Sequence, residues 1–143
     1  MAQLYFEDMQ EGSEMPSLEK CPSTQSLVRW AGASGDFYQI HYDKDFAQST
    51  GGLPGVIVHG ALKCAYLGQM LGDFAGEKGW VKKYGVSYRG MDVPNDKLTC
   101  KGKITKKYVE DNEHLVDCEI WLENSSGTKT TLGTAVVMLP SKG

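Results

Sequence analysis

Two hydrophobic periods follow one another along the chain. From Ser23 to about Leu71, apolar residues recur every three or four positions, the spacing of helices that bury one face. From Val86 onward, apolar and polar residues alternate over several stretches, which is the two-residue period of strands. Helices first and strands afterwards predict an α+β domain with an antiparallel sheet.

Two short helices are expected before residue 50. Ser23 or Thr24 can cap the first, which ends before Gly35. Asp43 can cap the second, and the glycine-containing segment 49–55 ends it. The apolar positions that define the first helix are Leu27, Val28, Trp30 and Ala31.

The longest helical stretch runs from His59 to about Leu71 and carries few charges apart from Lys63. Its apolar character predicts a buried central helix. The residues at helical spacing are Leu62, Ala65, Tyr66, Gln69 and Met70. Together with the strands, this helix predicts a curved antiparallel sheet wrapped around one helix.

Four strands are expected in the second half, separated by Asn, Asp, Gly and Pro residues that form turns. They cover residues 86–89, 98–109, 115–122 and 130–139. The faces expected to point toward the core are Val116, Cys118, Ile120 and Leu122 on the third strand, and Leu132, Thr134, Val136 and Met138 on the fourth.

Length and charge narrow the classes of function. A chain of 143 residues fits one domain, expected over residues 1–143. The net charge is −3 and the basic residues are scattered, so nucleic acid is not an expected partner. Apolar runs fall short of the roughly 20 residues that span a bilayer, and the first residues are acidic. We therefore expect a cytoplasmic protein without a membrane partner.

The four cysteines, Cys21, Cys64, Cys100 and Cys118, are widely spaced. They form no C-x-x-C pair, and no histidine stands at the spacing of a zinc ligand. We expect buried free thiols in a reducing compartment, with neither disulfides nor a metal site.

An acid and an imidazole stand close together in the sequence at Asp36 and His41. Five residues apart, they would point in different directions from one helix. They can converge only if Gly35 ends a helix and a loop follows. A helix opened by a glycine, Gly60, comes soon afterwards, and the combination suggests acid/base chemistry on a thioester.

These residues lie in motifs that resemble the MaoC-like hydratases and dehydratases. The matching patterns are A-G-x-S-G-D at 31–36, I-H-x-D at 40–43 and G-V-I-x-H-G-x-L at 55–62. The likeness continues through 84–89 and 93–96, so it covers nearly the whole chain. Within the family it is similar to subunits of (3R)-hydroxyacyl-ACP dehydratase and to (R)-specific enoyl-CoA hydratases. The resemblance implies a hot-dog fold.

The resemblance also implies an activity, the reversible hydration of trans-2-enoyl thioesters to (3R)-hydroxyacyl thioesters. Asp36 and His41 match the catalytic pair that orients water and transfers its protons. The backbone N–H of Gly60 matches the donor to the thioester oxyanion. His59 is interpreted as a structural residue that fixes the turn into the helix. The implied chemistry needs no metal or redox cofactor.

Two departures from the family pattern bear on the site. Tyr38-Gln39 replaces the usual Asn-Pro, which is compatible with unchanged catalysis, an altered substrate or lost activity. Gly68 stands where some members carry a serine, and it can either leave room for a larger acyl group or permit close helix packing. Lys63, Lys82 and Lys83 are either contacts for CoA or carrier-protein charges, or solvated surface residues.

The expected substrate is an acyl-CoA or an acyl-ACP. A single hot-dog domain leaves an exposed sheet edge, so we expect a homodimer or a heterodimer with another hot-dog chain. Two alternatives remain beside the leading interpretation. The chain is then either a subunit of a heteromeric dehydratase that is active only with its partner, or a dehydratase of a polyketide-type intermediate.

Overall fold

The computed structural model describes residues 2–143. Its helices are α1 (Thr24–Ser34), α2 (Lys44–Ser49) and α3 (Gly60–Ala75), with short 3-10 helices η1 (Phe6–Asp8) and η2 (Gln39–His41). Its strands are β1 (Leu18–Lys20), β2 (Trp80–Tyr88), β3 (Leu98–Glu110), β4 (Glu113–Glu123) and β5 (Lys129–Met138).

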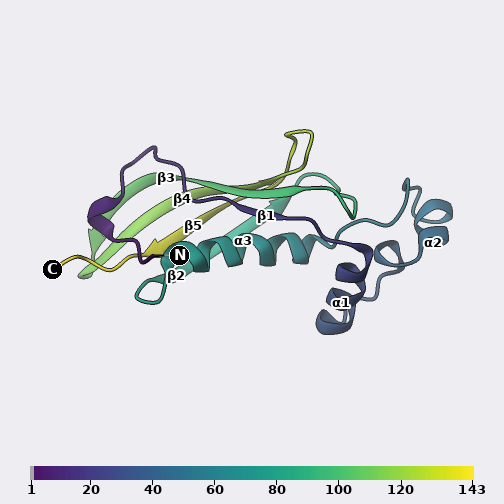
Figure 1. Cartoon of the computed structure of the whole chain (residues 1–143), viewed down its shortest axis with the longest axis horizontal. Helices are drawn as coiled ribbons and strands as arrows, with labels where there is room; N and C mark the ends of the chain where they lie inside the picture. Colours follow the sequence, from purple (N-terminus) through teal and green to yellow (C-terminus); the bar gives the residue numbers. More distant parts are fainter. Residues whose placement is uncertain (1) are drawn as a thin grey trace.

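The five strands form one antiparallel sheet in the order β1-β3-β4-β5-β2. The sheet curves over one side of α3, which runs along its length (Figure 1). This arrangement confirms the α+β architecture expected from the sequence. It is the hot-dog arrangement, a curved sheet around one central helix.

The core lies between α3 and the concave side of the sheet. Helix α3 buries Leu67, Met70, Leu71 and Phe74, and the central strands supply most of the facing side chains. The helix continues to Ala75, four residues beyond the expected end. Of the expected stripe, Leu62 and Met70 are buried, Ala65 and Tyr66 are half-buried and Gln69 is exposed. Leu67, which was not expected in the stripe, is fully buried.

The expected inward face of the fourth strand is wrong. Strand β5 buries Ala135 and Val137, whereas Thr134 is exposed and Val136 is half-buried. The register explains the difference, because Ala135 pairs with Cys118 and Val137 with Val116 of β4. Directly paired residues lie on the same face of the sheet. Ala135 and Val137 therefore point toward the core together with their buried partners on β4.

The other departures concern the ends of elements. Strand β2 begins at Trp80, six residues before the expected start at Val86, and β1 lies in a segment expected to be irregular. On α1 the buried residues are Leu27 and Ala31, while Val28 is 58% exposed. The remaining strands, together with α1 and α2, lie within a few residues of their expected positions.

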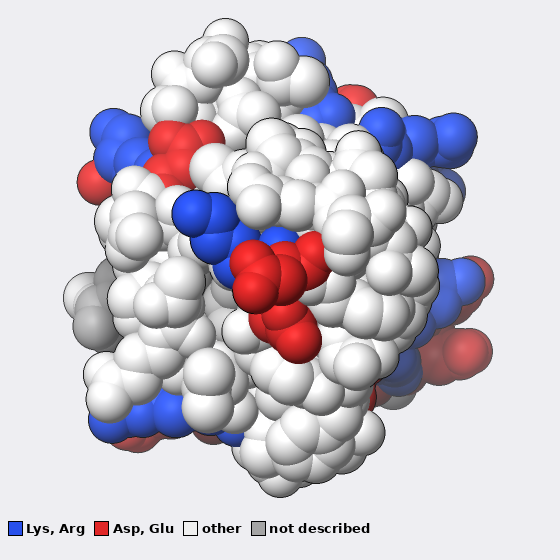
Figure 2. Space-filling model, turned by 90° about the vertical axis from the view of Figure 1, so that its right-hand side faces the viewer, with Lys and Arg blue, Asp and Glu red and all other residues white. Residues whose placement is uncertain are grey.

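Helices α1 and α2 sit beyond the N-terminal end of α3, at one end of the sheet (Figure 1). A small cluster of Leu27, Val58 and Leu62 joins α1 to the first turns of α3. Figure 2 shows that this end of the molecule is largely uncharged, with one small group of acidic and basic side chains near its centre. In the described part of the chain, no helix is both long and apolar enough to cross a membrane.

Candidate active site

The end of α1 places Asp36. Ser23 caps the helix at its start, and Gly35 ends it in the left-handed conformation with a φ of 79°. Glycine adopts this conformation without a side-chain penalty, and its N–H bonds to the carbonyl of Ala31. Asp36 therefore leaves the helix axis immediately, which confirms the expected break.

The loop to His41 forms without the proline of the family pattern. One oxygen of Asp36, Oδ1, accepts the backbone N–H of Tyr38 at 3.3 Å, closing a turn two residues long. The 3-10 turn η2 follows, and the N–H of His41 bonds to the carbonyl of Tyr38 at 3.1 Å. These hydrogen bonds orient the chain where Tyr38-Gln39 replaces Asn-Pro.

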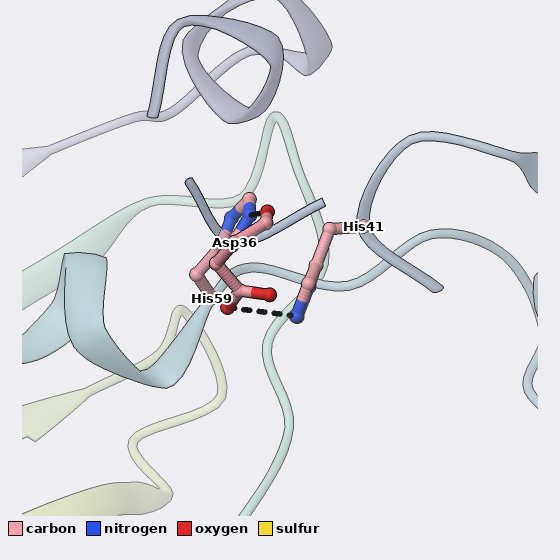
Figure 3. Close-up of side chains that lie close together, drawn as sticks. All are labelled: Asp36, His41 and His59. Atoms are coloured by element: carbon pink, nitrogen blue, oxygen red, sulfur yellow. Dashed lines mark hydrogen bonds and ion pairs between the residues drawn. The ribbon is translucent and has the colours of Figure 1, made fainter. Parts of the chain in front are cut away.

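Asp36 and His41 face one another across this loop. Oδ2 of Asp36 lies 3.9 Å from Nε2 of His41 (Figure 3). The His41 side chain is 9% exposed and that of Asp36 is 45% exposed, so the pair opens to solvent on the carboxylate side. The structure thus brings together the two residues that the sequence singled out.

The tautomer of His41 follows from its second hydrogen bond. Its Nδ1 lies 2.8 Å from the carbonyl oxygen of Ile57. A carbonyl oxygen only accepts, so Nδ1 carries the proton. In the neutral ring, Nε2 then has a free lone pair, and it is this atom that points toward Asp36.

His59 lies directly under the pair. Its ring is fully buried and stacks on His41, with centroids 3.8 Å apart and 19° between the planes. Its Nε2 donates to the backbone carbonyl of Asp36 at 3.3 Å, so His59 links the start of α3 to the Asp36 loop. Burial and the neighbouring His41 lower the pKa of His59 below 6.5, which favours the neutral ring.

Gly60 is the first residue of α3. Among residues 2–143, its backbone N–H has no hydrogen-bond acceptor, as expected for the first turn of a helix. A Cβ at this position would lie 3.1 Å from the ring of Tyr88. A side chain at this position would therefore require the Tyr88 ring to shift by a few tenths of an ångström. The free N–H adds to the positive end of the helix dipole.

A metal ion fits this cluster poorly. One ligand-type atom each of Asp36, His41 and His59 lies within 4.8 Å of the others. Histidine ligands bind zinc at about 2.0–2.1 Å with lone pairs that converge on one point. The two imidazoles are stacked with centroids 3.8 Å apart and 19° between their planes, so their in-plane lone pairs do not converge on one point. The arrangement is better suited to holding a water molecule.

The structure corrects the interpretation of Lys63 as a surface residue. Lys63 is 2% exposed and its ammonium group bonds to Oδ2 of Asp92 at 2.9 Å and to the carbonyl of Gly90 at 2.9 Å. Thr130 donates to the same carboxylate oxygen at 2.5 Å. The carbonyl of Asp92 also accepts the N–H of Val58, so this buried pair braces the segment just before α3. Asp92 lies beside an expected turn and carried no sequence signal of burial.

Gly68 reflects close packing. A Cβ on Gly68 would lie 2.5 Å from the hydroxyl oxygen of Tyr84 on β2. The phenol already fills the space beside the helix at this point. Of the two readings left open by the sequence, close packing against Tyr84 is the one found. The two other lysines considered, Lys82 and Lys83, are exposed.

A family model described as MaoC like domain matches residues 10–123. The chain belongs to the MaoC-like dehydratase family. The matched region contains the Asp36–His41 loop, all of α3 and strands β1 to β4. The site therefore lies within a domain whose family comprises hydratases and dehydratases.

Two curated relatives differ in how much of them the chain covers. The (R)-specific enoyl-CoA hydratase of Rhodospirillum rubrum is 29% identical over 145 residues, covering 97% of this chain and 94% of that protein. The fatty acid synthase beta subunit TOXC of Cochliobolus carbonum is 35% identical over 74 residues, covering 50% of this chain but 4% of that protein. The chain thus spans nearly all of the hydratase and a small part of the synthase subunit.

Solved structures share the fold at lower sequence identity. R-hydratase PhaJ1 from Pseudomonas aeruginosa has a TM-score of 0.87 at 18% identity, covering 98% of this chain and 88% of that one. The (R)-hydratase from A. caviae involved in PHA biosynthesis has a TM-score of 0.82 at 23% identity, covering 93% and 98%. The ChsH1-ChsH2 complex of Mycobacterium tuberculosis gives a TM-score of 0.77 at 22% identity, covering 91% and 98%. These likenesses establish the hot-dog fold.

Proposed function

We propose that this protein catalyses the reversible hydration of trans-2-enoyl thioesters to (3R)-hydroxyacyl thioesters. The observation that carries the proposal is the 3.9 Å approach of Asp36 Oδ2 to His41 Nε2, with the start of α3 beside them. The similarity to the R. rubrum enoyl-CoA hydratase over nearly its whole length supports the same reaction class.

In the proposed mechanism, Asp36 and His41 hold the attacking water together. A water oxygen about 2.8 Å from both Asp36 Oδ2 and His41 Nε2 forms ordinary hydrogen bonds to each atom. The angle between these two hydrogen bonds at the water oxygen is about 90°. Attack on Cβ requires the water to lose a proton, and Cα must gain one. The free lone pair of His41 Nε2 accepts the proton and returns it to Cα, while the carboxylate of Asp36 orients the water.

The N–H of Gly60 stabilises the charge that develops on the thioester oxygen. It is the first donor of α3, and a helix N-terminus favours negative charge. Losing a single donor of this kind typically costs about 3 kcal/mol of the barrier. The bonds from His59 to Asp36 and from His41 to Ile57 hold the donor and the catalytic pair in one rigid unit.

We further propose that one domain spans residues 1–143 and acts as a dimer. In the described residues, β2 has a sheet neighbour on one side only, and most of its residues are exposed. An open edge of nine residues favours pairing with another strand. The partner is a second copy or another hot-dog chain, and the ChsH1-ChsH2 structure, which is a complex of two chains, favours keeping the second option. The acyl group is carried by CoA or by an acyl carrier protein.

The test is loss of the conjugated enoyl absorbance when the purified protein meets crotonyl-CoA. We expect rapid loss of absorbance and formation of the (3R)-hydroxybutyryl product, established by chiral analysis. No absorbance change from a folded dimer would contradict the proposal. A folded monomer that becomes active only with a second hot-dog chain would instead select the heteromeric alternative.

A further inference from the structure

The backbone of Tyr38 is hydrogen-bonded to both members of the catalytic pair. Its N–H donates to Oδ1 of Asp36 at 3.3 Å, and its carbonyl accepts the N–H of His41 at 3.1 Å. Residues 36–39 are all exposed, so water competes with both hydrogen bonds. A loop held only by such bonds would let the carboxylate move relative to the imidazole.

The side chain of Tyr38 adds a constraint that water does not weaken in the same way. Its ring meets the ring of His41 edge to face, with centroids 6.4 Å apart and 84° between the planes. It meets Phe46 similarly, with centroids 6.1 Å apart and 72° between the planes. Aromatic pairs are favourable at centroid distances of roughly 4.5–7 Å. Although Tyr38 is 56% exposed, its ring therefore connects the buried His41 to the first turn of α2.

The backbone at Tyr38 and Gln39 follows a path that proline would also follow. Tyr38 has a φ of −65° and a ψ of 123°, in the extended region that residues before proline adopt. Gln39 is the first residue of η2, and proline is tolerated at the first position of a helix. In the part of the chain that the structure describes, the N–H of Gln39 has no acceptor, so proline would remove no hydrogen bond there.

Building on the proposed function, we infer that Tyr38 is a positioning residue for the Asp36–His41 pair. Packing of its ring against His41 and Phe46 holds residues 36–41 in the conformation that a proline at position 39 would fix covalently. Tyr38 acts through Asp36 and His41 and takes no proton from the substrate. A change that frees the loop lowers kcat, because the attacking water is then no longer held in one geometry.

The experiment measures kcat and KM for crotonyl-CoA with Tyr38→Ala, Gln39→Pro and the double variant. We expect Tyr38→Ala to lower kcat by about tenfold and to leave KM within about twofold of the wild type, since displacing positioned groups is costly. Gln39→Pro alone should keep the wild-type kcat. In the double variant, proline restricts the freed loop and should return kcat to within about threefold of the wild type.

Two further variants separate packing from other roles of the side chain. Tyr38→Phe keeps the ring and should keep the wild-type kcat. Phe37→Ala removes a neighbouring aromatic that is 58% exposed and pairs with the ring of Tyr42, and it should also keep the wild-type kcat. Amide hydrogen exchange at the N–H of His41 needs no substrate. Exchange should be faster in Tyr38→Ala than in the wild type, and slow again in the double variant.

Three results overturn the role of Tyr38. The first is wild-type kcat and wild-type amide exchange in Tyr38→Ala. The second is an inactive Gln39→Pro, or a loss in Tyr38→Ala that Gln39→Pro does not restore. The third is an equal loss in Tyr38→Phe, which would assign the effect to the hydroxyl. A wild type that shows the expected amide exchange but no activity on crotonyl-CoA contradicts the proposed function alone, so the two failures are distinguishable.

Discussion

His41 donates its Nδ1–H to the carbonyl of Ile57 at 2.8 Å, and this hydrogen bond determines which ring nitrogen faces Asp36. Ile57 lies on the segment that enters α3, three residues before Gly60. The carbonyl that fixes the imidazole and the N–H that can bind an oxyanion therefore belong to one short stretch of backbone.

This relationship predicts opposite tautomers for two stacked histidines. His41 should carry its proton on Nδ1, because of Ile57, and His59 should carry its proton on Nε2, because of the Asp36 carbonyl. Long-range proton–nitrogen NMR spectra distinguish the two forms at a pH well above the ordinary histidine pKa of about 6.5. Signals are assigned with His41→Gln and His59→Gln. An Nε2-protonated His41 would remove the proposed base.

Gly60 should not tolerate a side chain. Its φ is negative, so alanine can keep the backbone, but its Cβ would press on the Tyr88 ring at 3.1 Å. We expect Gly60→Ala to lower kcat with crotonyl-CoA by about tenfold to hundredfold, since small displacements of a positioned donor are costly.

Gly72→Ala is the matched control for this substitution. In the described residues, nothing lies within 4 Å of a Cβ at Gly72, which is on the same helix. It should leave kcat unchanged and stabilise the fold by about 0.5–1 kcal/mol, measured by urea unfolding. Equal kcat values for both variants and the wild type would argue against a strict requirement at Gly60.

The buried pair of Lys63 and Asp92, which braces the segment just before α3, should contribute strongly to the free energy of unfolding. Lys63→Met leaves the Asp92 carboxylate charged and buried, and we expect a loss of about 3–5 kcal/mol in the free energy of unfolding. Replacing both partners, Lys63→Met with Asp92→Leu, should restore most of that loss.

The exposed pair of Lys82 and Glu113 supplies the comparison. Both side chains are more than a third exposed, so Lys82→Met should change the free energy of unfolding by less than about 1 kcal/mol. Chemical denaturation gives the free energy of unfolding of Lys63→Met, of the double variant and of Lys82→Met, each compared with the wild type. Equal effects of Lys63→Met and Lys82→Met would show that the buried pair is not a structural brace.

His59 should make stability depend on pH. Its pKa in the folded protein is lowered by burial and by His41, so the unfolded chain binds a proton more readily than the folded one. The stabilisation by the neutral ring is complete above the ordinary pKa of 6.5 and is lost as the pH falls below it toward the lowered folded value.

The measurement is the free energy of unfolding of the wild type and of His59→Gln across this pH range. Glutamine does not titrate, so the advantage of the wild type over the variant should shrink as the pH falls below the ordinary histidine pKa. A difference that stays constant with pH would contradict the lowered pKa.

Local signals were enough to predict much of the fold and the convergence of the pair. Ser23 and Asp43 both cap the helices expected of them, and Gly35 ends α1 where the sequence placed its end. The loop between Asp36 and His41 followed from one glycine and a spacing. These features depend on residues close together in the chain, so a single sequence contains them.

Features set by distant partners were not predictable in this way. The inward face of β5 depends on its pairing with β4, in which Ala135 lies opposite Cys118. Lys63 is buried because Asp92, 29 residues later, neutralises it. Contacts between residues far apart in the chain cannot be predicted from the alternation of apolar and polar residues or from the distribution of charges along the sequence. The stacking of His59 on His41 also needed the fold, although the sequence had marked His59 as the residue before the helix.

The most direct test of the proposed mechanism is the rate of crotonyl-CoA hydration by Asp36→Asn and His41→Gln, beside the exposed control Asp45→Asn. General acid–base groups typically contribute 10²–10⁴-fold, so we expect each of the two variants to lose about 100-fold or more. Asp45→Asn should retain the wild-type rate, and all three should unfold cooperatively like the wild type. Near-wild-type hydration by both Asp36→Asn and His41→Gln would contradict the assignment of this pair as the catalyst.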